Sequence, residues 1–226
     1  MCSMVFEWME CVLMRVAIAL FEGFTVLDAV GPYQVLSAVP GVEAVLVGER
    51  VGPVLDHVGS ARMVAEAAFE EVERADVVVV PGGPGQVHHM DGGPVQEWVR
   101  AVDAGSTWTT SVCTGSLILA AAGLLRGRAA TTHWLAVDQL DAWGATASPE
   151  RVVFDGKYVS AAGVSAGIDM GLALAARLAG PMVAQTVQLG IEYDPRPPFD
   201  AGSPGSAPAE VVEFVRGNAD MVLRPQ

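Results

Sequence analysis

The amino-acid sequence predicts an α/β fold of three layers, with helices on both faces of a mostly parallel central sheet. Short apolar runs that suit buried strands alternate with stretches of helical periodicity, which is the order that βαβ units produce. The run Val77–Val80 is apolar at every position, as strands buried on both faces are. Glycines are frequent, 25 in all, and only 7% of residues are aromatic, so helices can pack closely on the sheet. We therefore expect a flavodoxin-like sheet with its functional groups at the carboxyl ends of the strands.

The elements predicted in the first half of the chain begin with a continuous apolar run, a strand at residues 16–20. A helix follows at residues 25–37, where Thr25 is the capping residue and Pro32 can kink the helix. Residues 44–47 are the second strand, before a Gly- and Pro-marked stretch that continues to residue 63. The strongest strand, Val77–Val80, ends at the segment Pro-Gly-Gly-Pro-Gly, and Pro94 opens a helix to residue 104.

The second half continues the alternation of strands and helices. Its predicted elements are a strand at 107–112, a small-residue helix at 114–122, a strand at 129–132, a helix at 133–143, a hairpin of 152–155 and 158–161 that turns at Gly156-Lys157, and helices at 165–178 and 181–191. Residues 194–208 contain five prolines and two glycines, so they form an extended loop that is neither helix nor central strand.

The length of 226 residues fits one domain better than two. The first clean strand pattern begins at Met14 or Arg15, so we predict an N-terminal extension outside the fold at residues 1–13 and a single domain at residues 14–226. No internal repeat or linker divides the chain.

Charge and cysteine content limit the classes of partner. With 13 basic and 26 acidic residues the net charge is −13, which repels phosphate backbones and anionic lipids, so neither nucleic acid nor a membrane is an expected partner. The three cysteines, Cys2, Cys11 and Cys113, imply no disulfide framework and favour a reducing compartment, the cytoplasm. Acidic residues near the N-terminus argue against a signal peptide.

Cys113 stands at a junction where a predicted strand runs straight into a helix, the arrangement of a nucleophile elbow. The helix dipole and free amides at such a position stabilise a thiolate, so the sequence predicts a Cys113 with a lowered pKa. A small buried cysteine that only packs at a strand end is the simpler alternative. The position at the junction, with Gly115 allowing a close approach of the helix, favours catalysis.

Three further features are expected at the same edge of the sheet. Gly82 and Gly83 offer backbone amides for developing negative charge, although a plain turn explains them equally well. Asp28 interrupts an apolar run, which indicates either a proton donor of raised pKa or a helix first-turn carboxylate. His133 starts a predicted helix and is more often structural than catalytic in such a position. The other histidines have no ligand partners at metal-binding spacing, so no metal site is predicted.

Taken together, these motifs resemble the ThiJ/PfpI (class I glutamine amidotransferase-like) superfamily, and within it the isonitrile hydratase branch. The matching stretches are Gly-Phe-Thr-Val-Leu-Asp at 23–28, Val-Pro-Gly-Gly at 80–83, Thr-Ser-Val-Cys-Thr-Gly-Ser-Leu at 110–117, Ala-Thr-Thr-His-Trp at 130–134, Ala-Gly-Ile-Asp at 166–169 and the Pro-rich segment after Glu192-Tyr193. The resemblance covers the chain from Met14 onward. Asp28 in place of the usual Glu, Thr114 after the cysteine and the Pro-rich segment look specific to the hydratase branch.

The resemblance implies a role for each matching residue. Cys113 matches the family nucleophile and Asp28 its acidic partner, while Gly83 and Thr114 match residues whose backbone amides form an oxyanion-type site. Gly82 and His133 match the lining of the pocket. Protease-like members have His directly after the cysteine, and Thr114 at that position argues against peptidase activity. A chain that ends at Gln226 is also expected to lack the helix-turn-helix of regulators in this superfamily.

The function implied by the resemblance is that of a hydro-lyase that needs no cofactor. Protonation of an isonitrile carbon by Asp28 and attack by Cys113 give a thioimidate, which water converts to an N-substituted formamide. The alternatives are a glyoxalase or deglycase acting on 2-oxoaldehydes, and a thiol-based redox sensor or chaperone. The family also implies a homodimer in which residues 194–208, with Tyr193 and Phe199 among their apolar neighbours, lie near the partner subunit and the pocket entrance.

Overall fold

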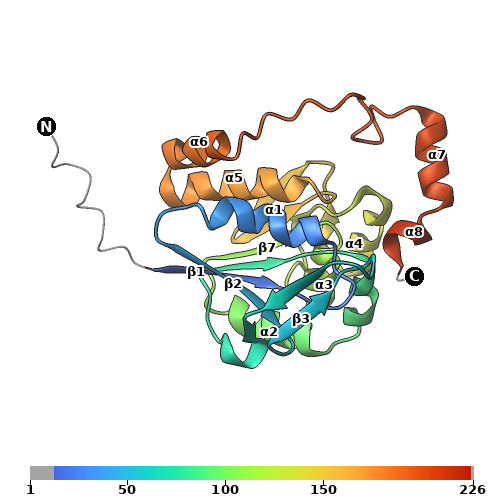
Figure 1. Ribbon diagram of the computed structural model, residues 1–226. Coiled ribbons are helices and arrows are strands. Elements are labelled where there is room, and N and C mark those ends of the chain that lie inside the picture. The colour runs from blue at the N-terminus through green and yellow to red at the C-terminus, as the bar shows by residue number, and fades with distance from the viewer. Residues whose placement is uncertain (1–12, 225–226) are drawn as a thin grey trace, which may run out of the picture.

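A seven-stranded sheet forms the centre of the computed structural model, which describes residues 13–224 (Figure 1). In spatial order its strands are β10 (Val152–Asp155), β11 (Tyr158–Ala161), β7 (Trp108–Val112), β6 (Val77–Val80), β1 (Met14–Ala19), β2 (Val42–Gly48) and β5 (Ala67–Ala68). β10 is antiparallel to β11 and the other neighbours pair in parallel. The predicted α/β fold with a mostly parallel sheet is therefore confirmed.

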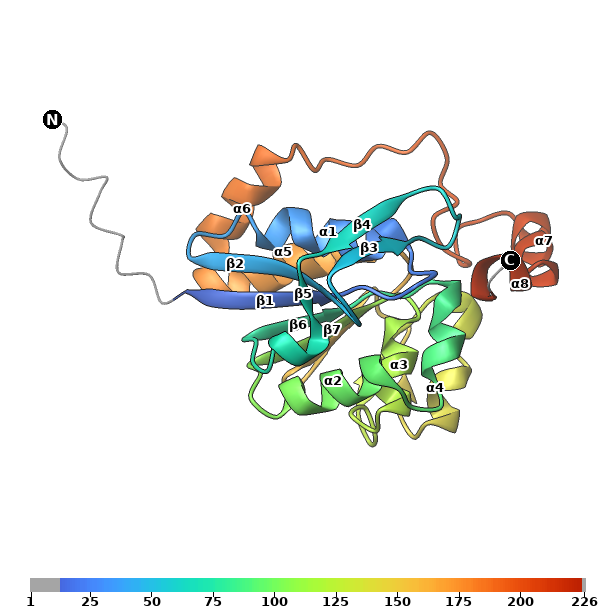
Figure 2. The ribbon, with the colours of Figure 1, turned by 60° about the horizontal axis from the view of Figure 1, so that its bottom comes forward.

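Helices cover both faces of this sheet, so its central strands are buried on two sides (Figure 2). One face carries α1 (Val26–Leu36) and α5 (Ala166–Ala179), with α6 (Pro181–Gly190) packed on α5. The other face carries α2 (Pro94–Asp103), α3 (Gly115–Ala121) and α4 (Gln139–Ala142). All four valines of β6 are fully buried, which explains the unbroken apolar run in the sequence.

Several predicted elements are confirmed within one or two residues at their ends. They include α1 with Pro32 inside it, β6, the hairpin of β10 and β11 with Gly156 at positive φ, and the α5–α6 pair. Residues 194–208 contain no helix or strand, as their prolines predict. None of the helices within residues 13–224 is long and apolar enough to cross a bilayer. The predicted N-terminal extension lies, apart from Leu13, outside the described residues.

The predictions for residues 129–143 were right only in part. The predicted strand is only β8 (Ala129–Ala130), which pairs with β9 (Thr146–Ala147) in a separate small sheet, and the predicted helix is a 3₁₀ turn at Trp134–Ala136 followed by α4. Hydrogen bonds explain the difference. Thr131 N–H donates to Ser160 Oγ and Thr132 Oγ1 donates to the Cys113 carbonyl, so the chain follows the ends of β7 and β11 instead of continuing as strand.

The two largest parts of the structure without a counterpart in the prediction are a hairpin and the helices near the C-terminus. The Gly- and Pro-marked stretch before residue 66 contains a hairpin of β3 (Gly52–Leu55) and β4 (Arg62–Ala65). The chain after the Pro-rich loop forms α7 (Ala209–Gly217) and α8 (Asp220–Leu223), and α7 lies away from the sheet (Figures 1 and 2). α7 buries no side chain completely, because its apolar residues Val211, Val212 and Val215 line a small surface pocket with Trp134 instead of packing into the core.

Candidate active site

Cys113 lies in the turn between β7 and α3, with φ of 56°, a backbone conformation that costs a non-glycine residue about 1–3 kcal/mol. Hydrogen bonds on both sides hold it there. Its N–H donates to the carbonyl of Ala162 over 2.9 Å, and its own carbonyl accepts from Thr132 Oγ1 over 2.9 Å. The strand–turn–helix junction predicted from the sequence is present, and these hydrogen bonds hold its strained backbone in place at the end of the sheet.

Two glycines allow the turn to sit directly against β6. A Cβ on Gly115 would lie 2.1 Å from the carbonyl oxygen of Val80, and one on Gly82 would lie 2.5 Å from the backbone nitrogen of Thr114. Both positions therefore require glycine because backbone atoms of the neighbouring segment occupy the space. As a result the Pro-Gly-Gly segment and the cysteine turn, which follow adjacent strands, lie in direct contact.

Asp28 in the first turn of α1 is fully buried and contacts the Pro-Gly-Gly segment at Gly82. Its Oδ2 accepts a hydrogen bond of 2.9 Å from Gly82 N–H, while Oδ1 has no hydrogen-bond partner among the described residues. Burial raises the pKa of Asp28 to about 7, although the hydrogen bonds from Gly82 and from the Cys113 thiol act in the opposite direction. Asp28 is thus a carboxyl group that is half protonated near neutral pH.

The pKa of Cys113 is raised, contrary to the expectation that a helix dipole lowers it. Burial is the larger cause, since only 4% of the residue is exposed, and the nearby charge of Asp28 adds to it. Backbone N–H groups of Val164 and Thr114 bond to the sulfur and favour the thiolate, but less strongly. α3 has only seven residues, so its dipole is also small. The proton of the buried pair therefore resides on sulfur at neutral pH.

The backbone N–H of Gly83 was predicted to stabilise negative charge on a substrate. In the structure it donates a hydrogen bond within the protein instead, which corrects that prediction. Gly83 N–H donates to Thr114 Oγ1 over 3.0 Å. The amides that bond the sulfur belong to Thr114 and to Val164, and sequence reasoning did not identify Val164. Val164 follows β11, and only the order β11–β7 brings it beside Cys113, so no local sequence signal could have identified it.

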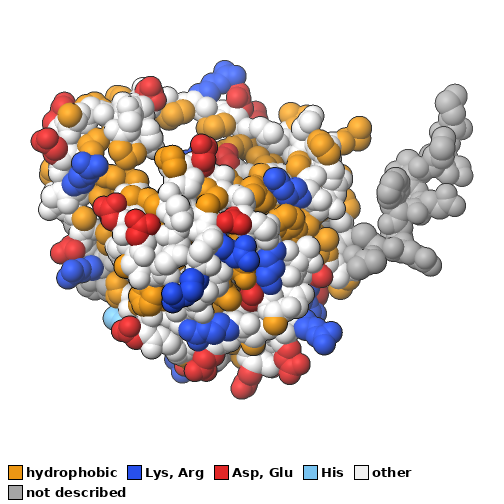
Figure 3. Space-filling model, turned by 180° about the vertical axis from the view of Figure 1, so that it is seen from behind, with side chains coloured by type: hydrophobic (Ala, Val, Ile, Leu, Met, Phe, Trp, Pro, Cys, Tyr) orange, Lys and Arg blue, Asp and Glu red, His pale blue; other side chains and the backbone are white. Residues whose placement is uncertain are grey.

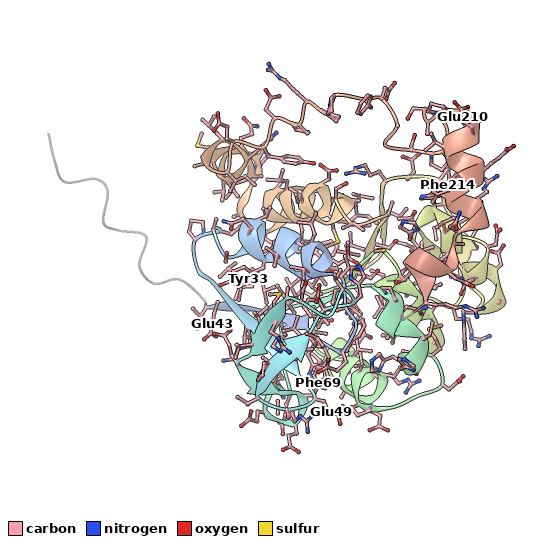
Figure 4. All side chains as sticks on the ribbon, turned by 45° about the vertical axis from the view of Figure 1, so that its right-hand side comes forward. Tyr33, Glu43, Glu49, Phe69, Glu210 and Phe214 are labelled. Atoms are coloured by element: carbon pink, nitrogen blue, oxygen red, sulfur yellow. The ribbon has the colours of Figure 1, made fainter. Side chains whose placement is uncertain are left out.

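A pocket of about 740 Å³ is lined by residues that flank Cys113, although the buried side chains of Cys113 and Asp28 are not part of its wall. Thr132, which bonds the Cys113 carbonyl, and Val164, which bonds its sulfur, both line this pocket. Its wall consists of Leu27, residues 131–134, Val137, residues 147–149, Arg151, residues 162–165, residues 202–204 and Arg216. The Pro-rich loop and α7 thus form part of the wall, and Figure 4 shows α7 with Glu210 and Phe214.

His133 lines the pocket, as the resemblance implied, but makes no hydrogen bond to Cys113 or Asp28. Its Nδ1 accepts from Leu135 N–H over 3.3 Å, which caps the 3₁₀ turn, and burial lowers its pKa. A neutral imidazole that caps a turn fits the structural alternative. Among residues 13–224 no three His, Cys, Asp or Glu side chains lie close enough together to hold a metal ion.

The chain is similar to a known protein family and to several known proteins. The sequence model of the DJ-1/PfpI family matches residues 14–177. Isonitrile hydratase from Pseudomonas putida is 43% identical over 211 residues, which are 93% of this chain and 92% of that protein. The crystal structure of a ThiJ/PfpI family protein from Pseudomonas syringae has 35% identity and a TM-score of 0.90 over 99% of this chain and 94% of the other. Drosophila melanogaster DJ-1beta, at 22% identity and a TM-score of 0.72 over 79% of this chain and 97% of the other, shares the fold.

Proposed function

The chain belongs to the DJ-1/PfpI family, and we propose that it is an isonitrile hydratase, which adds water to an isonitrile to form an N-substituted formamide. The buried pair of Cys113 and Asp28 carries this proposal, because it joins a sulfur nucleophile to a proton donor of pKa about 7. The identity to the Pseudomonas putida enzyme extends over nearly the whole of both chains and supports the same activity.

The reaction begins from the form in which Cys113 is a thiol and Asp28 is a carboxylate. Asp28 takes the proton of the Cys113 thiol and delivers it to the terminal carbon of the isonitrile, which becomes electrophilic. The sulfur bonds to that same carbon and gives a thioimidate, R–N=CH–S–Cys113. Insertion of the carbon between sulfur and hydrogen balances this step without an oxidant or a cofactor.

Water then completes the reaction at the same carbon. Its oxygen adds to the thioimidate carbon, one of its protons goes to nitrogen, and the remaining hydroxyl proton passes to Asp28 as the carbon–sulfur bond breaks. The products are R–NH–CHO and a thiolate, which regains its proton from Asp28. The Thr114 and Val164 amides that bond the sulfur stabilise the thiolate when it forms and when it leaves.

A parallel assay with two substrates tests the activity. The purified protein is expected to convert ethyl isocyanoacetate to the corresponding formamide and to leave methylglyoxal unchanged, with both reactions followed by NMR. If only methylglyoxal is converted, the proposed hydratase activity is wrong and the protein is a glyoxalase or deglycase. Inertness towards both substrates, together with rapid oxidation of Cys113 by peroxide, would favour the redox sensor instead. The raised pKa of Cys113 argues against that last outcome, since the thiolate is the form that attacks peroxide.

We also propose that the protein is a homodimer whose interface includes α6 and the Pro-rich loop. Large apolar side chains project from these segments, with Met182 and Leu189 each 81% exposed and Phe199 78% exposed. Exposed apolar groups of this size are unfavourable in water, and a second copy of the chain related by a two-fold axis would cover them. Because residues 202–204 line the pocket, the interface would also support the pocket wall.

Light scattering after gel filtration tests the assembly. Wild-type protein is expected to elute with twice the mass of the 23.6 kDa chain, and Met182→Glu to shift it towards the monomer. Val58→Glu is the matched control, since Val58 is 67% exposed in the loop after β3, and it should leave the dimer intact. A fully active monomer at micromolar concentration would contradict both the dimer and its role at the pocket.

A further inference from the structure

We infer that the pocket beside Cys113 selects isonitriles that carry a carboxylate, and that Arg216 binds this carboxylate. The inference rests on the proposed hydratase activity and names the substrate class within it. Arg216 belongs to α7, which is distant in sequence from Cys113 and Asp28 and outside the residues that the family model matches.

The distribution of charge is the first observation. Acidic side chains outnumber basic ones by two to one in this chain, and the surface in Figure 3 shows both kinds intermixed. The pocket wall departs from this composition, because its charged side chains are Arg151 and Arg216 and it contains no carboxylate. His133 adds no negative charge and is held neutral by burial, which lowers its pKa. The wall therefore presents a positive potential within an acidic protein.

The charge of Arg151 is balanced inside the protein. Its Nε donates to Asp169 Oδ2 and its Nη2 donates to Ser165 Oγ over 3.1 Å. The other oxygen of Asp169 accepts from Tyr193 Oη over 3.0 Å. This network ties the pocket wall to the start of the Pro-rich loop, and the partner carboxylate cancels most of the field of Arg151 at the pocket.

Arg216 lacks such a partner. Its guanidinium lies 5.7 Å from the centroid of the Trp134 ring, and no ion pair to it exists among the described residues. A cation–π contact orients a guanidinium without neutralising it, since the ring carries no net charge. The five N–H donors of the group therefore stay available to a ligand, and their planar fork matches a carboxylate. Both Arg216 and Trp134 line the pocket, so the donors are held at its wall.

A second part of the pocket wall favours the same sign of ligand. Residues 162–165 lead into α5, a helix of 14 residues that begins at Ala166, so the positive end of its dipole lies at this part of the wall, where Asp169 in the first turn offsets part of it. An isonitrile with its terminal carbon at Cys113 and an anionic group at Arg216 would span the pocket. A neutral isonitrile of the same shape would gain nothing from the guanidinium.

A matched pair of substrates long enough to span the pocket tests the inference: 6-isocyanohexanoate and its ethyl ester differ in the charge of the group that would lie at Arg216. The wild-type protein is expected to hydrate the carboxylate with a kcat/KM at least tenfold above that of the ester, and this preference should weaken as salt is added. Arg216→Gln should lower kcat/KM for the carboxylate about tenfold, mainly through KM, and leave the ester unchanged. Arg216→Lys retains the charge and should recover part of the preference.

The control is Arg177→Gln, which removes an arginine that also lies over an aromatic ring, that of Phe154, but does not line the pocket. It should change neither substrate. If the ester is hydrated as well as the carboxylate, or if Arg216→Gln affects both equally, the inference is wrong while the hydratase activity stands. If neither isonitrile is hydrated, the proposed function fails, and the inference fails with it.

Discussion

Replacing Cys113 with alanine is expected to abolish isonitrile hydration, with a loss of roughly 10⁴-fold or more in kcat. The sulfur forms the covalent bond to the substrate carbon, and a methyl group offers no lone pair for that step. Cys113→Ser should be nearly as inactive, because a buried hydroxyl is a much weaker nucleophile than a thiol at the same position. Both variants are measured by formamide production under single-turnover and steady-state conditions.

The control for these variants removes the other two cysteines. Cys2→Ala combined with Cys11→Ala should retain full activity, since both residues precede the sheet and carry no predicted chemistry. Thermal unfolding of the Cys113 variants should show that the fold persists. Mass spectrometry of wild-type protein mixed with an isonitrile should detect an adduct with the mass of one substrate. Activity retained in Cys113→Ala would rule out the thioimidate.

Replacing Asp28 with asparagine is expected to lower the hydration rate by about 10²–10⁴-fold, the usual contribution of a proton-transfer group. An amide cannot take the thiol proton or deliver it to carbon, but its oxygen can still accept the hydrogen bond from Gly82 N–H. The wild-type pH–rate profile should show an inflection near pH 7 that is missing from the variant, because burial raises the pKa of Asp28 to about 7. Near wild-type activity would reduce Asp28 to a structural residue.

The same variant should stabilise the protein at neutral and alkaline pH. The pKa of Asp28 is raised from 3.8 to about 7, so the folded state binds the proton more tightly than the unfolded chain. The contribution of Asp28 to the free energy of unfolding is therefore fully present below about pH 4 and is lost as the pH rises to about 7. The loss is about 1.4 kcal/mol for each pH unit and about 4 kcal/mol in total. Asp28→Asn lacks this loss and should melt above wild type at pH 8, with little difference at pH 4.

Asp56 is a control whose pH dependence has the opposite sign. Burial opposes its ionisation, but backbone N–H donors that include Ser60 and Ala61 outweigh burial and lower its pKa. Its contribution to stability is therefore present above the unfolded pKa and lost as the pH falls. Asp56→Asn should melt below wild type at pH 7 and approach it on acidification. A scan in which Asp28→Asn follows that same pattern would contradict the raised pKa of Asp28.

The central sheet could be predicted from the sequence because the burial of each strand determines the pattern of apolar residues within that strand. β6 is apolar at every position since it is buried on both faces, and the prolines of residues 194–208 exclude helix wherever the chain goes. The failures concern segments whose conformation depends on distant groups. Residues 131–133 follow the hydroxyl of Ser160 and the carbonyl of Cys113, and neither partner is a neighbour in sequence.

The main residues of the candidate site could be predicted from the sequence, but their contacts with one another could not. A nucleophile between a strand and a helix, a carboxylate in an apolar run and a glycine pair after a strand are local patterns, so Cys113, Asp28 and Gly82 could be identified by reading along the chain. That the three lie in contact depends on β6 lying between β1 and β7, which is a property of the sheet order. The engagement of Gly83 N–H by Thr114 Oγ1 likewise follows from packing between adjacent turns.

By itself, the sequence determined which groups are available for chemistry, since residue type and local strand or helix pattern are encoded within a few neighbours. The tertiary structure alone decided their protonation, because the pKa of a carboxyl or thiol depends on how much water and how many charges surround it. Burial and the nearby charge of Asp28 raise the pKa of Cys113, whereas the sequence predicted a lowered pKa. The tertiary structure also places Arg216 of α7 at the wall of a pocket that Thr132 and Val164, two neighbours of Cys113, line as well, over a distance in sequence that no local pattern can span.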